Sequence, residues 1–178
     1  MNRLKRWGLA GLITITVLGF LLHYLFSWTN ESKIIGLFVP VNESVWEHLK
    51  LGYWSVLVFS VAEYPNIKHN VSNYFFAKTI GVLALEITII IIFYGYTFIA
   101  GKDILFLDIL SYILGAVACQ YLTYMFLKSR PFSTLTNRLS LAVFIAIGIL
   151  FAVATYYPPH SEVFKDHNDN TYGIYKEK

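Results

Sequence analysis

Apolar and polar residues alternate in long blocks along this chain. Five stretches of about 20 residues or more are mostly apolar, and short polar segments separate them. Because an α-helix rises about 1.5 Å per residue, roughly 20 apolar residues cross the hydrocarbon layer of a membrane. The pattern therefore predicts an all-α fold, a polytopic bundle of about five transmembrane helices. Their expected ranges are 7–28, 44–64, 73–99, 104–127 and 135–157, followed by a tail over 158–178.

Composition supports the membrane interpretation. Residues of the hydrophobic class make up 56% of the 178 residues and charged residues only 14%, whereas about a quarter of a soluble domain is charged. So little charge excludes an ordinary soluble enzyme and a disordered chain, and a single cysteine excludes an intrachain disulfide. The apolar segment 33–41 is too short to span and is expected to be interfacial or re-entrant.

Basic residues predict the orientation. Cytoplasmic loops of membrane proteins carry an excess of lysine and arginine. With a cytoplasmic N-terminus, only Lys33 and Lys102 lie on the outer side before the tail, and the inner side holds Arg3, Lys5, Arg6, Lys68, Lys128, Arg130 and Arg138. The tail after the fifth helix is then extracytoplasmic. The net charge is only +3, and no segment of the sequence is dense in lysine and arginine. The predicted partner is therefore the lipid bilayer and not a nucleic acid.

A polar segment, PVNESVWEHLK at residues 40–50, lies where the second helix should enter the membrane. The 14 residues from Leu51 to Tyr64 cover only about 21 Å, less than a membrane thickness. The helix must therefore draw Glu47 and His48 into the outer leaflet. Polar groups at that depth are costly and should face the bundle interior, a wet cavity or one another.

These residues predict an outward-facing polar pocket. Its members come from the second helix and the tail: Asn42, Glu43, Ser44, Glu47, His48, Lys50, His160 and Asp166. The plainer alternative is a helix end capped by Asn42, with a local Glu47–Lys50 pair, beside a solvated tail, and for the tail this alternative is preferred. The residues that could bind a metal are Glu47, His48, His160 and Asp166, although no tight metal-binding motif is present.

Glu86 lies near the middle of the third predicted span, where ionisation is costly. It is expected either to be protonated and bonded to Gln120 or a backbone carbonyl, or to act in an ion or proton relay. His23, toward the outer end of the first span, could close the same cavity, and the alternative is a lone histidine that is simply hydrogen-bonded. Asp103 and Asp108 are expected to be an interfacial loop residue and a charge at a helix N-terminus.

The string PVNESVWEHLKL resembles an uncharacterised family of small bacterial integral membrane proteins, and the ending adds Pro158, Pro159, Phe164, Asp166, Tyr172 and Gly173 to the resemblance. The resemblance covers nearly the whole chain. It implies a bacterial plasma-membrane location, and it implies no activity, substrate or cofactor.

Three functions remain open from the residues. The first is a polar pocket that binds a lipid headgroup, a small solute or a metal, with hydrolytic chemistry as one use of it. The second is a transport or permeation component with Glu86 in its pathway, which would need a homo-oligomer because five spans are few. The third is a structural or regulatory subunit of a membrane partner protein.

Overall fold

A computed structural model of the chain describes residues 3–176. Five long helices and three short 3-10 helices make up this part: α1 (Arg3–Trp28), η1 (Ile35–Leu37), α2 (Val45–Ile67), η2 (Lys68–Asn70), α3 (Tyr74–Ala100), α4 (Leu105–Leu127), α5 (Thr134–Tyr156) and η3 (Glu162–Phe164). The predicted all-helical bundle is confirmed, and each long helix begins and ends within four residues of its predicted range.

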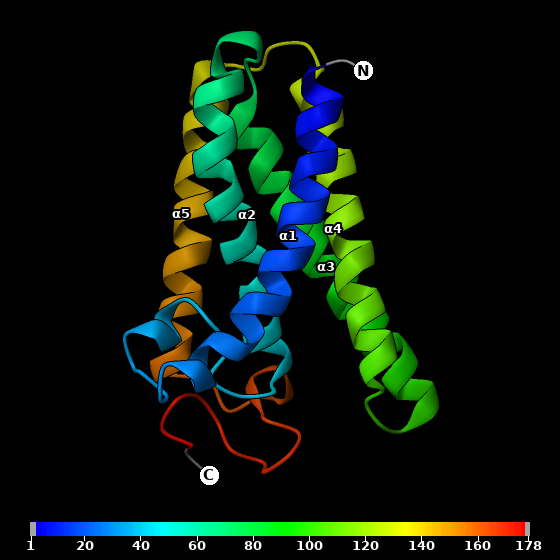
Figure 1. Ribbon diagram of the computed structural model, residues 1–178, viewed down its shortest axis with the longest axis vertical. Coiled ribbons are helices and arrows are strands. Elements are labelled where there is room, and N and C mark those ends of the chain that lie inside the picture. Colours follow the sequence, from blue (N-terminus) through cyan, green and yellow to red (C-terminus); the bar gives the residue numbers. More distant parts are fainter. Residues whose placement is uncertain (1–2, 177–178) are drawn as a thin grey trace.

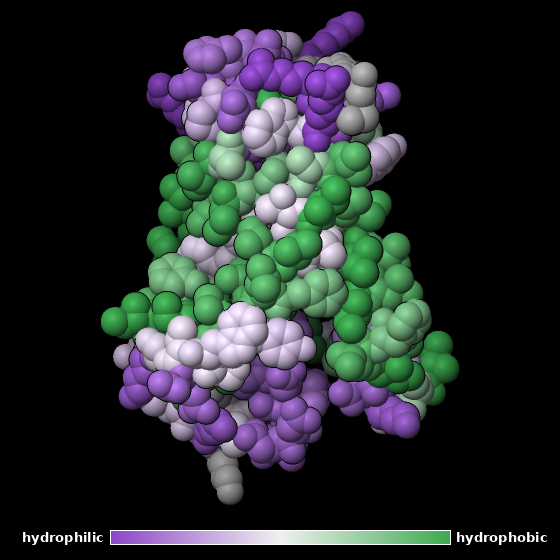
Figure 2. Space-filling view, in the orientation of Figure 1, coloured by the Kyte–Doolittle hydropathy of each residue, from purple (hydrophilic) through white to green (hydrophobic). Residues whose placement is uncertain are grey.

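The five long helices run alongside one another, each roughly antiparallel to the next (Figure 1). The loop between α1 and α2, the α3–α4 turn and the C-terminal tail all lie at one end, here called the tail end. In Figure 2 an apolar belt surrounds the middle of the molecule, and hydrophilic residues gather at both ends. This distribution is the one that a bilayer requires.

Four helices of the described part, α1, α3, α4 and α5, are long and apolar enough to cross a membrane. The 23 residues of α2 measure about 35 Å, which is also long enough. Helix α2 has more buried polar side chains than any of the other four long helices, and they include Glu47, Lys50, Ser55 and Glu63. Because α2 packs against α1, α3 and α5, the other helices shield these groups from the apolar belt.

The start of α2 differs from the prediction at one residue. Ser44, and not Asn42, is the N-cap: its side chain accepts a hydrogen bond from the Glu47 amide at 3.3 Å. Asn42 lies before the cap, where its side-chain Oδ1 accepts a hydrogen bond from the Ser44 amide at 3.0 Å. The sequence S-x-x-E at residues 44–47 is a capping-box spacing, which favours this start.

The tail packs against the bundle, so the preferred expectation of a solvated tail is wrong for its described residues. The Ile174 amide donates to the Thr155 carbonyl at 2.9 Å, and the Glu43 amide donates to the Asp166 carboxylate at 3.2 Å. The Phe164 and Trp46 rings lie 4.5 Å apart between centroids. The tail thus closes over the first turn of α2.

Candidate functional site

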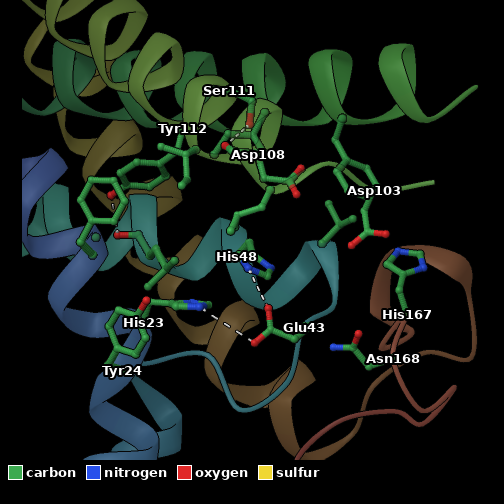
Figure 3. A pocket seen from close by; sticks show the side chains of 18 residues that line it. His23, Tyr24, Glu43, His48, Asp103, Asp108, Ser111, Tyr112, His167 and Asn168 are labelled. Carbon is green, nitrogen blue, oxygen red and sulfur yellow. Dashed lines mark hydrogen bonds and ion pairs between the residues drawn. The ribbon is translucent and has the colours of Figure 1, made fainter. Parts of the chain in front are cut away.

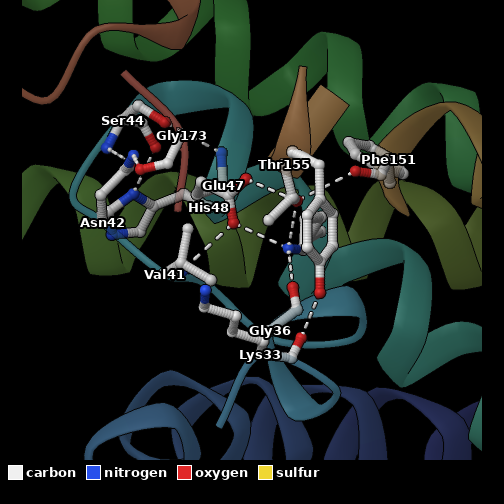
Figure 4. Close-up of polar contacts among 12 residues, drawn as sticks. Lys33, Gly36, Val41, Asn42, Ser44, Glu47, His48, Phe151, Thr155 and Gly173 are labelled. Atoms are coloured by element: carbon white, nitrogen blue, oxygen red, sulfur yellow. Dashed lines mark hydrogen bonds and ion pairs between the residues drawn. The ribbon is translucent and has the colours of Figure 1, made fainter. Parts of the chain in front are cut away.

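Glu47 and Lys50 form a buried ion pair one turn into α2 (Figure 4). The Lys50 Nζ lies 2.8 Å from the Glu47 Oε2, and it also donates to the Gly36 carbonyl and the Thr155 hydroxyl at 2.7 Å each. The Glu47 carboxylate accepts further bonds from the Val41 amide at 3.1 Å and from Thr155 at 2.9 Å. Both charges are therefore fully partnered, and they join the α1–α2 loop, α2 and α5.

This network uses several residues that the sequence assigns to a pocket. Glu47 and Lys50 are 2% and 0% exposed, so neither is free to bind a ligand. Asn42 and Ser44 are buried in the capping bonds, and the Asn42 amide donates to the Gly173 carbonyl of the tail. These four residues hold the site in place rather than forming its surface.

His48, the residue after Glu47, belongs to a different group of side chains. Together with His23 of α1 and Glu43 of the preceding loop it forms the histidine–glutamate cluster. One ligand atom from each residue lies within 4.8 Å of the others, with 3.3 Å between His48 Nε2 and Glu43 Oε2 and 4.0 Å between His23 Nε2 and Glu43 Oε1. Two imidazoles and a carboxylate are a ligand set that zinc uses in catalytic sites.

The hydrogen bonds of His48 fix which of its nitrogens is available. Its Nδ1 lies 2.9 Å from the Ser44 carbonyl oxygen, which can only accept, so Nδ1 carries the proton. In the neutral ring the Nε2 lone pair then faces the Glu43 carboxylate. That contact is favourable only with a cation between the two atoms, either a proton on Nε2 or a metal ion. A carbonyl that orients a ligating histidine is also typical of metal sites.

Glu43 is stabilised in its charged form. The hydrogen bond from His48 lowers the pKa of this carboxyl, and the charges of His48 and His23 act in the same direction against partial burial. A deprotonated Glu43 is the form that binds a metal.

The cluster lies on the wall of a cavity of about 360 Å³, here called the side pocket (Figure 3). The pocket lies between the tail-end halves of α1, α2 and α4, and Phe93 of α3 and the tail contribute to it. Its floor includes Tyr112, whose hydroxyl donates to the Ile15 carbonyl at 3.0 Å. A ligand bound to the cluster would therefore lie in a space large enough for a small molecule.

The side pocket also contains residues that the sequence did not assign to it. Asp103, Asp108, His167 and Asn168 line it beside the cluster (Figure 3). Asp108 accepts a hydrogen bond from the Tyr96 hydroxyl. His23 lines the side pocket, in agreement with the expectation that it could close a cavity, whereas the aspartates had been assigned only to a loop and a helix end. The two aspartates lie near the polar segment because of the way α4 packs against the other helices, and no local sequence pattern indicates that packing.

The tail residues of the predicted pocket lie outside the cluster. The His160 ring lies 4.7 Å from the Tyr172 ring. Asp166 accepts from the Glu43 and Asn168 amides, at 3.2 and 2.8 Å, and so supports the loop that carries Glu43. Of the four predicted metal ligands, only His48 is a member of the cluster in the described part of the chain.

Glu86 is buried in α3, as predicted, at 7% exposure. Its two carboxylate oxygens and the Gln120 amide nitrogen have no hydrogen-bond partner among the described residues, so the expected Glu86–Gln120 bond is not formed. Near the opposite end of the bundle, Lys78 and Glu63 form a second buried ion pair, which was not predicted from the sequence. Tyr74 donates to the same Glu63 carboxylate at 3.0 Å.

The fold and the site define a helical bundle, compatible with a multi-pass membrane protein, that carries an imidazole–carboxylate cluster in a cavity near one end. The chain belongs to a family of unknown function, DUF6512, which it matches over residues 1–174. No curated protein and no solved structure matches it.

Proposed function

We propose that this protein is a multi-pass protein of the bacterial plasma membrane whose side pocket opens outward and binds a divalent metal ion, with zinc as the best fit. The observation that carries the proposal is the contact between His48 Nε2 and the Glu43 carboxylate at 3.3 Å, beside a second imidazole and next to a cavity.

The spacing of the ligand atoms supports zinc. Bonds of about 2.0–2.1 Å at tetrahedral angles place neighbouring ligand atoms about 3.3 Å apart. The distance between His48 Nε2 and Glu43 Oε2 has this value. His23 Nε2 lies 4.0 Å from the other oxygen of the same carboxylate, and the ligand atoms lie within 4.8 Å of one another, so the His23 ring must move closer to complete the site. The fourth position would face the side pocket, where water or a substrate can bind. Zinc with an open position lowers the pKa of bound water and supports hydrolytic chemistry.

Metal analysis tests the proposal. Purified protein, stripped with a chelator and titrated with zinc, is expected to bind one ion per chain and to gain thermal stability. His48→Ala and His23→Ala should each weaken zinc binding at least tenfold. The control is His69→Ala, an exposed histidine at the opposite end, which should bind as wild type does. Unchanged zinc binding by both cluster variants would overturn the proposal.

A second candidate function is proton permeation through Glu86, because its unpartnered carboxylate and the unpartnered Gln120 amide lie among apolar residues within the predicted membrane region. A lone ionised carboxylate there is costly, so a role in carrying a proton would explain its presence. In proteoliposomes Glu86→Gln should abolish proton flux while leaving zinc binding unchanged. Equal flux in the variant would exclude this candidate.

A further inference from the structure

We propose that the side pocket binds the headgroup of a membrane lipid that carries both a phosphate and an amine, of the phosphoethanolamine type, and that the lipid enters between α1 and α4. The proposal rests on the proposed metal site, because the metal supplies the contact with phosphate.

The walls of the pocket indicate an amphiphile. Beside its polar groups it is lined by Phe20 of α1 and by Leu105 and Ile109 of α4. Phe20 and Leu105 are 41% and 74% exposed, so this wall continues into the apolar outer surface of the bundle. In Figure 2 the surface is hollowed between the tail-end parts of α1 and α4. A water-soluble solute would gain little from such a wall, whereas an acyl chain would be buried along it.

The depth of the cluster matches a lipid headgroup. His23 precedes Trp28 by five residues, which is about 7.5 Å along the axis of α1. Tryptophans at the ends of spans lie at the membrane interface, and Trp28 is 64% exposed. The cluster therefore lies just inside the interface, where the polar part of a lipid meets its chains.

The charges of the pocket indicate which headgroup fits. A divalent ion on the histidine–glutamate cluster would attract a phosphate. Asp103 and Asp108 come from the α3–α4 turn and the first turn of α4, and they line the pocket outside the cluster (Figure 3). Two carboxylates there would attract an ammonium group and repel a second anion. A zwitterionic headgroup would pair its phosphate with the metal and its amine with the two aspartates. A purely anionic lipid would pair only with the metal.

Lipid binding by the zinc-loaded protein tests this inference. Mixed micelles would be doped with phosphatidylethanolamine, with phosphatidylglycerol or with diacylglycerol, and glycerophosphoethanolamine would serve as the headgroup without chains. We expect phosphatidylethanolamine to bind at least tenfold more tightly than the other three. Removing zinc should weaken its binding at least tenfold.

Two variants distinguish the pocket from the general lipid surface. Ile109→Trp fills the apolar half of the pocket and should reduce phosphatidylethanolamine binding at least tenfold. The adjacent Leu110 is 36% exposed and lies outside the pocket lining, so Leu110→Trp should bind as wild type does. Zinc stoichiometry is measured in both variants and should remain one per chain, which shows that each is folded.

Three results would overturn the inference while leaving the metal site intact. They are equal binding of glycerophosphoethanolamine and the intact lipid, equal binding of phosphatidylglycerol, and wild-type lipid binding by Ile109→Trp with zinc bound. Failure of the proposed metal site would be seen separately, as absence of zinc from the wild-type protein.

Discussion

Consecutive residues of α2 have opposite environments. Glu47 accepts hydrogen bonds from Val41, Lys50 and Thr155, and it is buried. His48 turns about 100° further around the helix and faces His23 and Glu43 at the side pocket. One turn of α2 therefore holds both an internal ion pair, which fixes the position of the helix, and the central residue of the candidate site.

The buried ion pair should matter for stability far more than an exposed one. Lys50→Met leaves the Glu47 charge buried and without its cation, which should cost about 3–5 kcal/mol. The control is Lys165→Met, because Lys165 forms a partly exposed pair with Glu162 at the same i,i+3 spacing. That variant should lose less than about 1 kcal/mol. Denaturation in detergent measures both, and similar losses would contradict the structural role of the Glu47–Lys50 pair.

Glu43 should make the metal-free protein sensitive to acid. Its pKa is below the usual 4.5 in the folded state, so its contribution to stability is complete above that value. The contribution is lost as the pH falls from about 4.5 through the lower folded pKa. Because the side chain is 48% exposed, the effect should not exceed about 1 kcal/mol. In thermal denaturation, Glu43→Gln should remove this part of the loss of stability at low pH. An unchanged loss of stability at low pH in the variant would show that other groups cause it.

Helices α3 and α4 approach each other closely through small residues. A Cβ on Gly81 of α3 would lie 3.0 Å from the Cys119 carbonyl and closer still to the Thr123 hydroxyl. On α4, a Cβ on Gly115 would lie 3.0 Å from the Leu85 carbonyl. Gly81 was not predicted from the sequence to be a contact. The hairpin that carries Asp103 and Asp108 to the pocket thus depends on close contact in the middle of the bundle.

Two glycines of α3 test this contact. Gly81→Ala should destabilise the protein by about 1–3 kcal/mol, because the backbone of α4 must move away. Gly95 has open space around it, so Gly95→Ala should be neutral or should stabilise the helix by up to about 1 kcal/mol. Thermal stability in one detergent compares them. A larger loss at Gly95 would show that the helix pair is not packed in this way.

At the scale of elements, the sequence was most informative about the helices. Long apolar runs located all five, because a membrane span must be long and continuous. The N-cap was misplaced by two residues, since Asn42 and Ser44 are both good capping residues and only the bond from Glu47 distinguishes them. The packing of the tail depends on long-range contacts such as Asn42 with Gly173, which local patterns do not contain.

The whole molecule has a polar end that contains the tail, the pocket and the α3–α4 turn. The distribution of lysine and arginine predicts that this end lies outside the cell. The three cluster residues were difficult to group from sequence, because His23 lies on α1 while Glu43 and His48 lie 20 and 25 residues later. The depth of a polar residue within a span was the useful signal, and it identified His48. The same signal also selected Glu47, whose carboxylate is occupied by hydrogen bonds within the protein.

Orientation can be tested with single cysteines, since native Cys119 is buried. Glu162 at the tail end and Asn66 near the opposite end of α2 are both exposed. In intact cells a membrane-impermeant maleimide should label Glu162→Cys. Asn66→Cys should be labelled only after the membrane is permeabilised. The reverse pattern would place the side pocket in the cytoplasm.

X-ray absorption at the zinc edge tests the central claim most directly. The zinc-loaded protein should show two imidazole ligands and carboxylate or water oxygens at about 2.0–2.2 Å, and His48→Ala should lose one imidazole. The same scattering in His48→Ala as in wild type, or an all-oxygen shell in the wild-type protein, would contradict a metal site at His23, Glu43 and His48.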